Sequence, residues 1–153
     1  GEQTLAEALA PLDGRYDYVI LDTPPGWGAM TANVLFYAHE VLAPVSLEVL
    51  TLKGLVQFQG RLKAVQRHQD ITLDHVLPTF FDRRVKKSVE ILEQLQAYCG
   101  QQLCPPIRYN VRLSEAAGYG QTIYEYAPRC RGAEDYRRLT ERIARSASTQ
   151  EDP

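Results

Sequence analysis

The most constraining feature of the sequence is the segment from Tyr18 to Gly28, where a continuous apolar run ends at one carboxylate and enters a turn rich in proline and glycine. Such a run, bounded by turn residues, is typical of a strand buried on both faces of a parallel sheet. The pattern therefore predicts that Asp22 lies at the carboxyl end of a central strand. Ligands of open α/β sheets bind at that edge, and an acidic residue there can hold Mg²⁺ or its waters against the phosphates of a nucleotide.

The same pattern has a purely structural explanation, because an Asp after a strand often only caps the next helix or turn. Beyond Asp22, Pro24 and Pro25 fix φ and cannot continue a strand ladder. Gly26 can adopt backbone conformations that are closed to other residues. The turn is therefore expected either to hold one shape or to switch between two.

Composition limits the possible classes of protein. The 153 residues are 44% hydrophobic, enough for a core, and carry a formal net charge of -2, so nucleic-acid binding would need a local basic patch. No apolar stretch approaches the length of a membrane span and no leader pattern opens the sequence, which predicts a cytoplasmic chain with no membrane partner. The three cysteines are scattered without a C-x-x-C pair, which argues against a zinc or iron–sulfur site.

Hydrophobic periodicity predicts helices alternating with strands along the chain. The predicted helices are 2–12, 29–38, 51–68, 85–99, 113–118 and 133–145, and the predicted strands are 18–21, 40–45, 73–81 and 103–107, with 122–126 extended. Pro78 is expected near a bend or at an exposed strand end. The alternation predicts an α/β fold, a mostly parallel sheet with helices on both faces, as one domain over 1–146 and a flexible polar tail over 147–153.

Several short motifs of the sequence occur in the same order as in one known family. They are Asp22-Thr23-Pro24-Pro25-Gly26, Phe81-Asp82-x-Arg84, Asn110-Val111-Arg112-Leu113-Ser114-Glu115-Ala116 and Gly132-Ala133-Glu134-x-Tyr136. Together they resemble the ParA/Soj partition ATPases, which are related to MinD and belong to the deviant Walker A group of P-loop NTPases. Two departures stand out: Trp27 is bulkier than usual at its position, and Arg108-Tyr109 stands where the family often has Pro-Arg.

The resemblance implies a role for each matching residue. Asp22 becomes the catalytic carboxylate of Walker B, which holds Mg²⁺ through water, and Thr23, Pro24, Pro25 and Gly26 become switch II. The implied nucleotide-binding residues are Phe81, Asp82, Arg108 and Asn110. The implied DNA-binding residues are Arg83, Arg84, Lys86, Lys87 and Arg112. Structural alternatives remain open: a turn residue for Asn110, a salt bridge for Arg112 and a solvated helix start for the other cations.

One expected motif of the family is missing from the sequence. The phosphate loop ends in Gly-Lys-Thr/Ser, and this sequence contains no Gly-Lys pair. The chain is therefore predicted to be a P-loop NTPase-like domain that is incomplete at its N-terminus and inactive in ATP hydrolysis by itself. Without the phosphate-loop strand, parallel strands would lack a neighbour and apolar faces would be uncovered.

For the intact parent protein, the resemblance implies that it binds and hydrolyses Mg-ATP and forms a homodimer with ATP. It further implies nucleoid association through non-specific DNA binding, and plasmid or chromosome partition with a ParB-like activator. Two alternatives remain: a non-catalytic interaction module, or a related ATPase that positions other cargo, MinD-like or a cellulose-secretion accessory protein.

Overall fold

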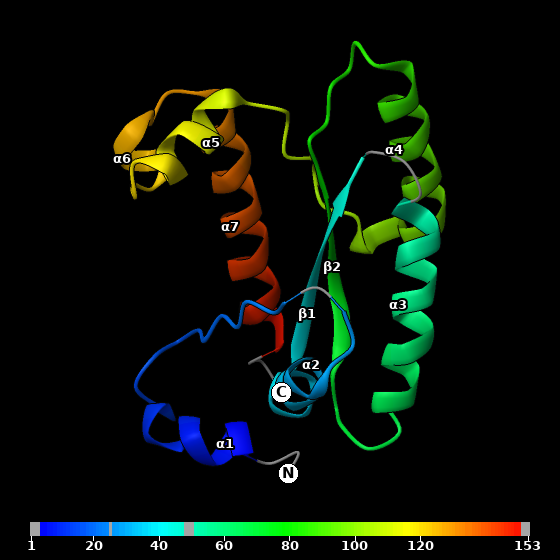
Figure 1. Cartoon of the computed structure of the whole chain (residues 1–153), viewed down its shortest axis with the longest axis vertical. Helices are drawn as coiled ribbons and strands as arrows, with labels where there is room; N and C mark the ends of the chain where they lie inside the picture. The colour runs from blue at the N-terminus through cyan, green and yellow to red at the C-terminus, as the bar shows by residue number, and fades with distance from the viewer. Residues whose placement is uncertain (1–3, 25, 48–50, 151–153) are drawn as a thin grey trace. The chain divides into compact units, whose positions relative to one another are not determined.

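The computed structural model describes residues 4–24, 26–47 and 51–150 (Figure 1). The helices and strands follow in the order α1 (Thr4–Leu9), α2 (Ala29–Tyr37), β1 (Glu40–Ser46), α3 (Thr51–Val65), β2 (Thr72–Thr79), α4 (Lys86–Cys99), α5 (Val111–Gly118), α6 (Ile123–Tyr126) and α7 (Arg131–Gln150). Short 3-10 turns follow α1 and α4, at Ala10–Leu12 and Gly100–Gln102. The chain divides into two compact units, Gly1–Val41 with Gln57–Asp74, and Leu42–Val56 with His75–Pro153.

Strands β1 and β2 are neighbours and run in parallel. The Thr72 amide donates to the His39 carbonyl oxygen at 3.0 Å, and the Leu47 amide donates to the Thr79 carbonyl oxygen at 3.1 Å. Residue numbers rise in both strands from the first of these pairs to the second, so the two strands are parallel. Helix α3 connects them. The predicted α/β class, a parallel sheet flanked by helices, is confirmed.

In the second unit, residues 103–108 lie along β2. Four contacts join the two segments: the parallel bridges Val76–Leu103 and Phe81–Arg108, and the Cys104 and Ile107 amides donating to the Val76 and Pro78 carbonyl oxygens, both at 2.8 Å. The strand predicted over 103–107 is therefore reduced to isolated bridges. Pro105 and Pro106 explain this, because neither has an amide hydrogen with which to continue a ladder.

One of the two alternatives predicted for Pro78 is confirmed, because Pro78 lies two residues before a bend at Phe80, and the other, an exposed strand end, is wrong. Pro78 is inside β2, and its side chain is fully buried. In a parallel ladder the amide and carbonyl of one residue face the same neighbour, and the Pro78 carbonyl faces Ile107. The Pro78 nitrogen, which has no hydrogen to donate, therefore faces the irregular segment 103–108. Because that segment forms no regular ladder with β2, the proline interrupts no regular row of hydrogen bonds.

Helix α7 covers one side of β2 in this unit, and α4 lies on the other side (Figure 1). The core under α7 contains Leu77, Cys104, Ile107 and Leu139, with Leu42, Leu113 and Ile143 packed against it. Full burial of an aliphatic side chain stabilises a fold by about 1.5–3 kcal/mol. This core fixes the position of the chain where β2 ends.

A second cluster joins α5, α6 and α7 through Ala116, Ile123 and Ala133. Gly132 allows this close approach, since a Cβ there would lie 2.9 Å from Leu113 Cγ. Helix α7 continues to Gln150, into the segment predicted as a polar tail. In the described part of the chain, no helix has both the length and the apolarity of a membrane span.

The extended segment predicted over 122–126 is wrong, because these residues begin helix α6. Thr122 forms a capping box with Glu125: the Glu125 amide donates to Thr122 Oγ1 at 3.3 Å, and the Thr122 amide donates to Glu125 Oε2 at 2.9 Å. The Thr122 amide and hydroxyl both donate to Glu125 Oε2, the hydroxyl at 2.8 Å, and these two hydrogen bonds lower the pKa of Glu125. The signal was present in the sequence as Thr-x-x-Glu before an apolar residue.

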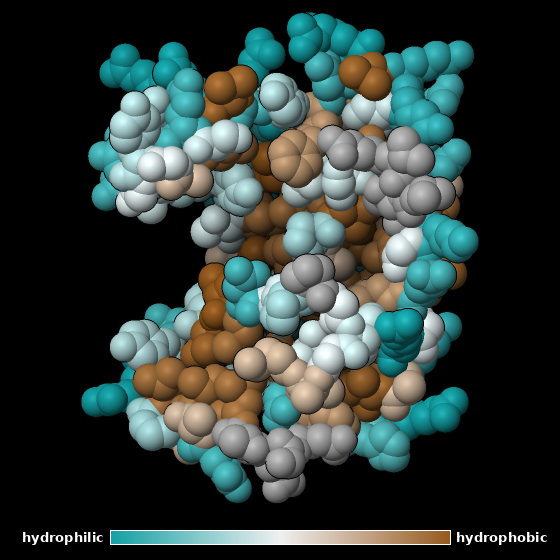
Figure 2. Space-filling model, viewed as in Figure 1, coloured by the Kyte–Doolittle hydropathy of each residue, from teal (hydrophilic) through white to brown (hydrophobic). Residues whose placement is uncertain are grey.

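In the first unit, the buried core includes Val34, Leu35, Leu62 and Ile71. The strand predicted over 18–21 is wrong. Tyr18, Val19 and Ile20 are exposed, Ile20 by 91%, and the segment has no regular secondary structure. Among the described residues no strand pairs with it, and an isolated extended segment has neither ladder hydrogen bonds nor burial to hold it. Figure 2 shows apolar surface over this part of the chain.

Candidate functional site

Two loops that carry predicted nucleotide-binding residues begin side by side at the end of β2. The Phe81 amide donates to the Ile107 carbonyl oxygen at 3.1 Å, and the Tyr109 amide donates to the Phe81 carbonyl oxygen at 2.9 Å. Phe81, Asp82, Arg108 and Asn110 are all half-buried. The structure thus brings these four residues to the carboxyl edge of parallel chain segments, where ligands of α/β proteins bind.

The backbone is strained at the start of the first loop. Phe80 has φ +56°, in the left-handed region, and its side chain is exposed. A bulky residue in this region costs of order 1–3 kcal/mol, and such residues cluster at functional sites. The hydrogen bonds on both sides of Phe81 hold the strained turn in place.

Asp82 shapes the next turn by binding Arg84. The Arg84 amide donates to Asp82 Oδ1 at 3.0 Å, and its guanidinium donates to Asp82 Oδ2 through Nη2 at 2.7 Å. The Asp82 amide donates to the buried hydroxyl of Ser88 on α4 at 3.3 Å. The side-chain hydrogen bond from Arg84, together with the one from its backbone, lowers the pKa of Asp82 to about 2.

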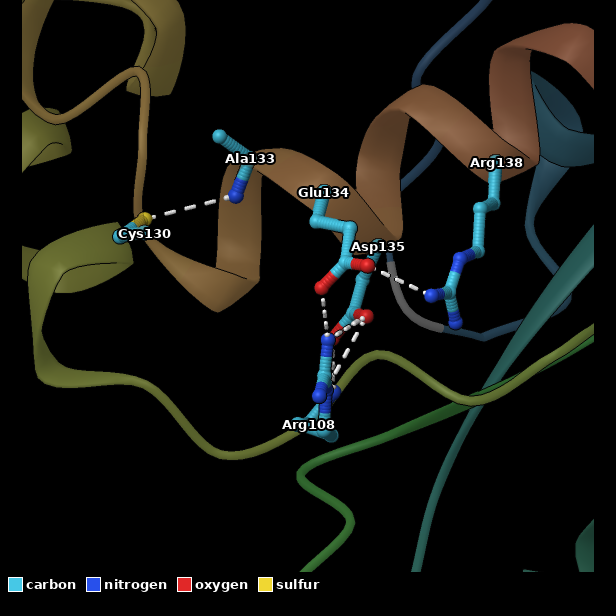
Figure 3. A network of polar contacts seen from close by, with 6 residues as sticks. All are labelled: Arg108, Cys130, Ala133, Glu134, Asp135 and Arg138. Carbon is cyan, nitrogen blue, oxygen red and sulfur yellow. Dashed lines mark hydrogen bonds and ion pairs between the residues drawn. The ribbon is translucent and has the colours of Figure 1, made fainter.

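The second loop is fastened to the start of α7 by the network in Figure 3. Arg108 makes its contacts to two adjacent acids: its amide to Asp135 Oδ2 (2.9 Å), Nε to Asp135 Oδ1 and Oδ2 (3.1 and 3.0 Å), and Nη2 to Asp135 Oδ1 (2.6 Å) and Glu134 Oε2 (2.7 Å). Asp135 is only 4% exposed. A buried carboxylate is tolerated only when it is paired and hydrogen-bonded, as it is here.

The same network extends along α7. Glu134 also accepts from Arg138 Nη2 through Oε1 at 2.6 Å. The hydrogen bond from Arg108 and the charge of Arg138 lower the pKa of Glu134, and the two acids raise the pKa of Arg108. Sequence reasoning missed Asp135 because it is remote in sequence from Arg108 and only the fold brings them together.

Asn110 and Arg112 both make local contacts at the start of α5. Asn110 is its N-cap, with Oδ1 accepting from the Arg112 amide at 3.0 Å. Arg112 Nη1 donates to Glu115 Oε2 at 3.0 Å, and the Tyr126 hydroxyl donates to the same oxygen at 3.0 Å. The salt bridge considered as the structural alternative for Arg112 is therefore present in the fold. Asn110 has a structural role as a helix cap and not as a turn residue.

Four predicted DNA-binding cations gather around the start of α4. Arg83, Arg84, Lys86 and Lys87 are all exposed, and Lys86 Nζ is 3.7 Å from Glu90 Oε1. The first turn of α4 contains no acidic residue. Cations near a helix N-terminus oppose the helix dipole, so this cluster does not stabilise α4 and presents positive charge to solvent.

The predicted switch segment lies in the first unit. Asp22, Thr23 and Pro24 are exposed, and Pro25 lies outside the described residues. Gly26 has φ +104°, and its carbonyl oxygen accepts from Thr31 Oγ1 of α2 at 2.9 Å.

Trp27 attaches this segment to α3. Its ring centroid is 5.6 Å from that of Phe58, and the Arg61 guanidinium lies 5.4 Å from the ring. Aromatic pairs contribute about 0.5–1.5 kcal/mol, and an exposed cation–π contact about 0.5–1 kcal/mol. The spacing of Phe58 and Arg61 places both on one face of a helix, but nothing in the sequence pairs them with Trp27.

Asp22 is the candidate ligand for Mg²⁺ in the predicted switch segment. Across the described residues, no three or more His, Cys, Asp or Glu side chains are grouped to hold a metal ion. In nucleotide sites Mg²⁺ needs only one or two carboxylates, because phosphates and waters supply its other ligands. The single exposed carboxylate of Asp22 is compatible with that arrangement.

Comparison with known proteins gives consistent matches. Residues 1–75 match the family model described as an AAA domain. Sporulation initiation inhibitor protein Soj of Bacillus subtilis is 37% identical over 146 residues, covering 94% of this chain and 58% of Soj. Chromosome partitioning protein ParA of Myxococcus xanthus is 36% identical over 138 residues, covering 88% of this chain and 49% of ParA.

Among solved structures, cobyrinic acid a,c-diamide synthase from Mycobacterium smegmatis, with bound ADP and magnesium, has a TM-score of 0.73 and 32% identity. The match covers 94% of this chain and 53% of that one. The chain therefore spans about half the length of the relatives that it matches.

Proposed function

This chain belongs to the ParA/Soj family, and we propose that it forms part of an ATPase that binds and hydrolyses Mg-ATP to drive plasmid or chromosome partition. The observation that carries the proposal is the meeting of the loops at Phe81 and Arg108, held by the Tyr109 amide on the Phe81 carbonyl. A structural relative that contains ADP and magnesium supports the cofactors.

In this proposal Asp22 holds Mg²⁺, mostly through the waters of the ion. The ion, when bound, neutralises charge on the phosphates. Thr23, Pro24, Pro25 and Gly26 act as switch II, responding to the terminal phosphate. Two contacts hold this segment in the present structure: Thr31 Oγ1 donates to the Gly26 carbonyl oxygen, and the Trp27 ring packs on Phe58. A rearrangement of the switch would change one or both of these contacts.

Phe81, Asp82, Arg108 and Asn110, all in the second unit, are proposed to contact the nucleoside. Asp82 and Arg108 act by fixing their loops, because the carboxylate of Asp82 binds Arg84 and the guanidinium of Arg108 binds Asp135 and Glu134. Asn110 caps α5 and so sets the direction of the chain after Arg108 and Tyr109.

The intact protein is further proposed to dimerise with ATP, bind DNA without sequence preference at the nucleoid and respond to a ParB-like activator. The exposed cations Arg83, Arg84, Lys86 and Lys87, with Arg112, are the proposed phosphate contacts. Each contact would steepen the fall of log affinity with log salt by about 0.9. A cation cluster at the N-terminus of α4 is suited to anions, because amides and side chains there attract negative charge together.

The test uses the full-length gene product that contains this chain. Asp22→Ala should lower Mg-dependent ATP hydrolysis by roughly 100-fold or more, since metal-assisted charge stabilisation supplies several kcal/mol. Asp17→Ala is the matched control, because it removes another exposed aspartate of the same segment. Full turnover by the Asp22→Ala protein would reject the proposed role of Asp22.

The non-catalytic interaction module is the second candidate, and it predicts that the full-length gene product also lacks the phosphate loop. If the full-length product neither binds nor hydrolyses Mg-ATP, the hypothesis of a non-catalytic interaction module replaces the hypothesis of an ATPase.

A further inference from the structure

Trp27 fastens the chain to helix α3 just after the predicted switch residues. Its ring is half-buried, with its centroid 5.6 Å from that of Phe58 and the two ring planes inclined by 40°. The Arg61 guanidinium lies 5.4 Å from the centroid of the indole ring. The spacing of Phe58 and Arg61 places both contacts on one face of α3. Trp27, Phe58 and Arg61 all belong to the first unit.

The backbone is held differently on the two sides of Gly26. Gly26 has φ +104°, a conformation that other residues rarely adopt, and nothing lies within 4 Å of the position of a Cβ there. After Gly26, the chain is held by Trp27 and by helix α2, whose Ala32 amide donates to the Gly28 carbonyl oxygen at 3.1 Å. Before Gly26, residues 22–24 are exposed. Gly26 therefore lies at the boundary between an exposed and a fastened part of the chain.

The two contacts at this boundary differ in how readily they are lost. Thr31 Oγ1 donates to the carbonyl oxygen of Gly26, which is exposed, at 2.9 Å. If this hydrogen bond breaks, water can bind the carbonyl and the Thr31 hydroxyl can bind a carbonyl one helical turn earlier, so the net cost is small. Release of Trp27 instead exposes aromatic surface to water and breaks the contacts with both Phe58 and Arg61. A movement of the switch segment should therefore break the Thr31 contact and leave the Trp27 contact in place.

We propose that Trp27 is a positioning residue that anchors the end of the switch segment to α3 through Phe58 and Arg61, and so confines movement to the chain before Gly26. The inference rests on the proposed function, since it concerns the regulation of the same site. A fixed end returns the moving residues to one position against the terminal phosphate in each cycle. Trp27 is bulkier than usual at its position in the family, so the anchor is a feature of this chain.

The first experiment follows the fluorescence of Trp27 in the full-length gene product that contains this chain. Trp27 is the only tryptophan among the 153 residues, and subtraction of the Trp27→Phe spectrum isolates its signal from any tryptophan elsewhere in the product. Mg-ATP should leave the emission maximum of Trp27 and its quenching by acrylamide unchanged, because the ring stays on Phe58. Phe58→Ala should shift the emission to the red and increase the quenching, because the indole ring loses its cover.

Val56→Ala is the matched control for Phe58→Ala. Val56 is another apolar residue of α3, and residues two positions apart do not share a helix face. The Trp27 emission of this variant should match that of the natural protein. A red shift of Trp27 emission when Mg-ATP binds the natural protein would overturn the inference, because the ring would then leave Phe58 as the switch moves. The proposed function would remain intact in that case, since the nucleotide binds.

The second experiment measures ATP hydrolysis. Trp27→Ala should lower kcat by roughly 2- to 10-fold, the factor that corresponds to the loss of one aromatic contact. The KM should be nearly unchanged, because no residue proposed to contact the nucleotide is altered. Trp27→Phe should restore most of the activity, because it keeps a ring against Phe58. Met30→Ala is the control, since it removes another large apolar side chain, one that is already exposed.

The outcomes separate the inference from the proposed function. Equal kcat values for the natural protein and a folded Trp27→Ala protein would overturn the inference and leave the proposed function intact. If the natural protein neither binds nor hydrolyses Mg-ATP, the proposed function fails, and the inference fails with it.

Because Trp27 is half-buried, its replacement by alanine can also destabilise the chain. Arg61→Gln is the second variant: Arg61 is exposed, and the change removes only the cation beside the ring. It should lower kcat by a smaller factor than Trp27→Ala, with thermal melting measured alongside. In the Phe58→Ala background Trp27→Ala should have little further effect, because both changes remove the same contact. Equal losses in both backgrounds, or unchanged kcat in a folded Arg61→Gln protein, would contradict anchoring on α3.

Discussion

Two segments of this chain that are both predicted as strands differ in burial. Residues 18–21 and β2 both contain consecutive β-branched or aliphatic residues. In β2, Val76 is 0% and Leu77 is 4% exposed, whereas Ile20 in the first run is 91% exposed. The difference lies in the neighbours, because β2 has β1 on one edge and residues 103–108 on the other.

An apolar run forms a strand only where the fold supplies hydrogen-bonding partners. Among the described residues, nothing forms a ladder with residues 18–21. A strand at a sheet centre gains burial on both faces and hydrogen bonds on both edges, and neither is available to a single extended segment.

The largest expected effect tests the comparison directly. Leu77→Ala should lower the free energy of unfolding of the 153-residue chain by about 2–5 kcal/mol, because it leaves a cavity among Cys104, Ile107 and Leu139. Ile20→Ala should change it by less than about 0.5 kcal/mol, because the side chain is already in water. Urea unfolding followed by circular dichroism measures both.

A large loss of stability for Ile20→Ala would break the comparison. It would mean that residues 18–21 are buried in solution and that the segment finds a partner there.

A smaller effect is expected at two glycines. Gly132→Ala should destabilise the chain by about 1–3 kcal/mol, because the new methyl group would meet Leu113 Cγ at 2.9 Å. Gly60 of α3 has open space around it, so Gly60→Ala should stabilise the helix by about 0.5–1 kcal/mol. Opposite shifts in melting temperature are the expected result, and destabilisation of equal size at both sites would contradict the tight packing assigned to Gly132.

The smallest effect concerns the turn that follows β2. The Asp82 carboxyl should titrate at about 2, and Arg84→Ala should move its pKa back toward 3.8. Because the folded pKa is depressed, the stabilising contribution is present above about pH 4 and is lost as the pH falls toward 2. Carbon-detected NMR of the aspartate carboxyls over this range measures the shift, and a titration near 3.8 in the natural chain would mean that the Asp82–Arg84 turn is open in solution.

Much of the fold followed from local patterns. The helices α2 and α4, and the strands β1 and β2, lie within about two residues of their predicted positions. The resemblance, and not a local pattern, grouped Phe81 with Arg108, and the structure brings these two residues together. The partners of Arg108 and Trp27 did not follow, since Asp135 and Phe58 are remote in sequence and only packing selects them.

Hydrophobic periodicity was enough to predict the alternation of helices and strands and the parallel class, and the order of the motifs was enough to indicate the family. Tertiary packing selects which predicted strand is buried, buries Pro78 within β2 and places a buried aspartate against the Arg108 loop. Burial, ladder pairing and charge compensation depend on neighbours from elsewhere in the chain, and residue order alone does not specify which neighbours meet.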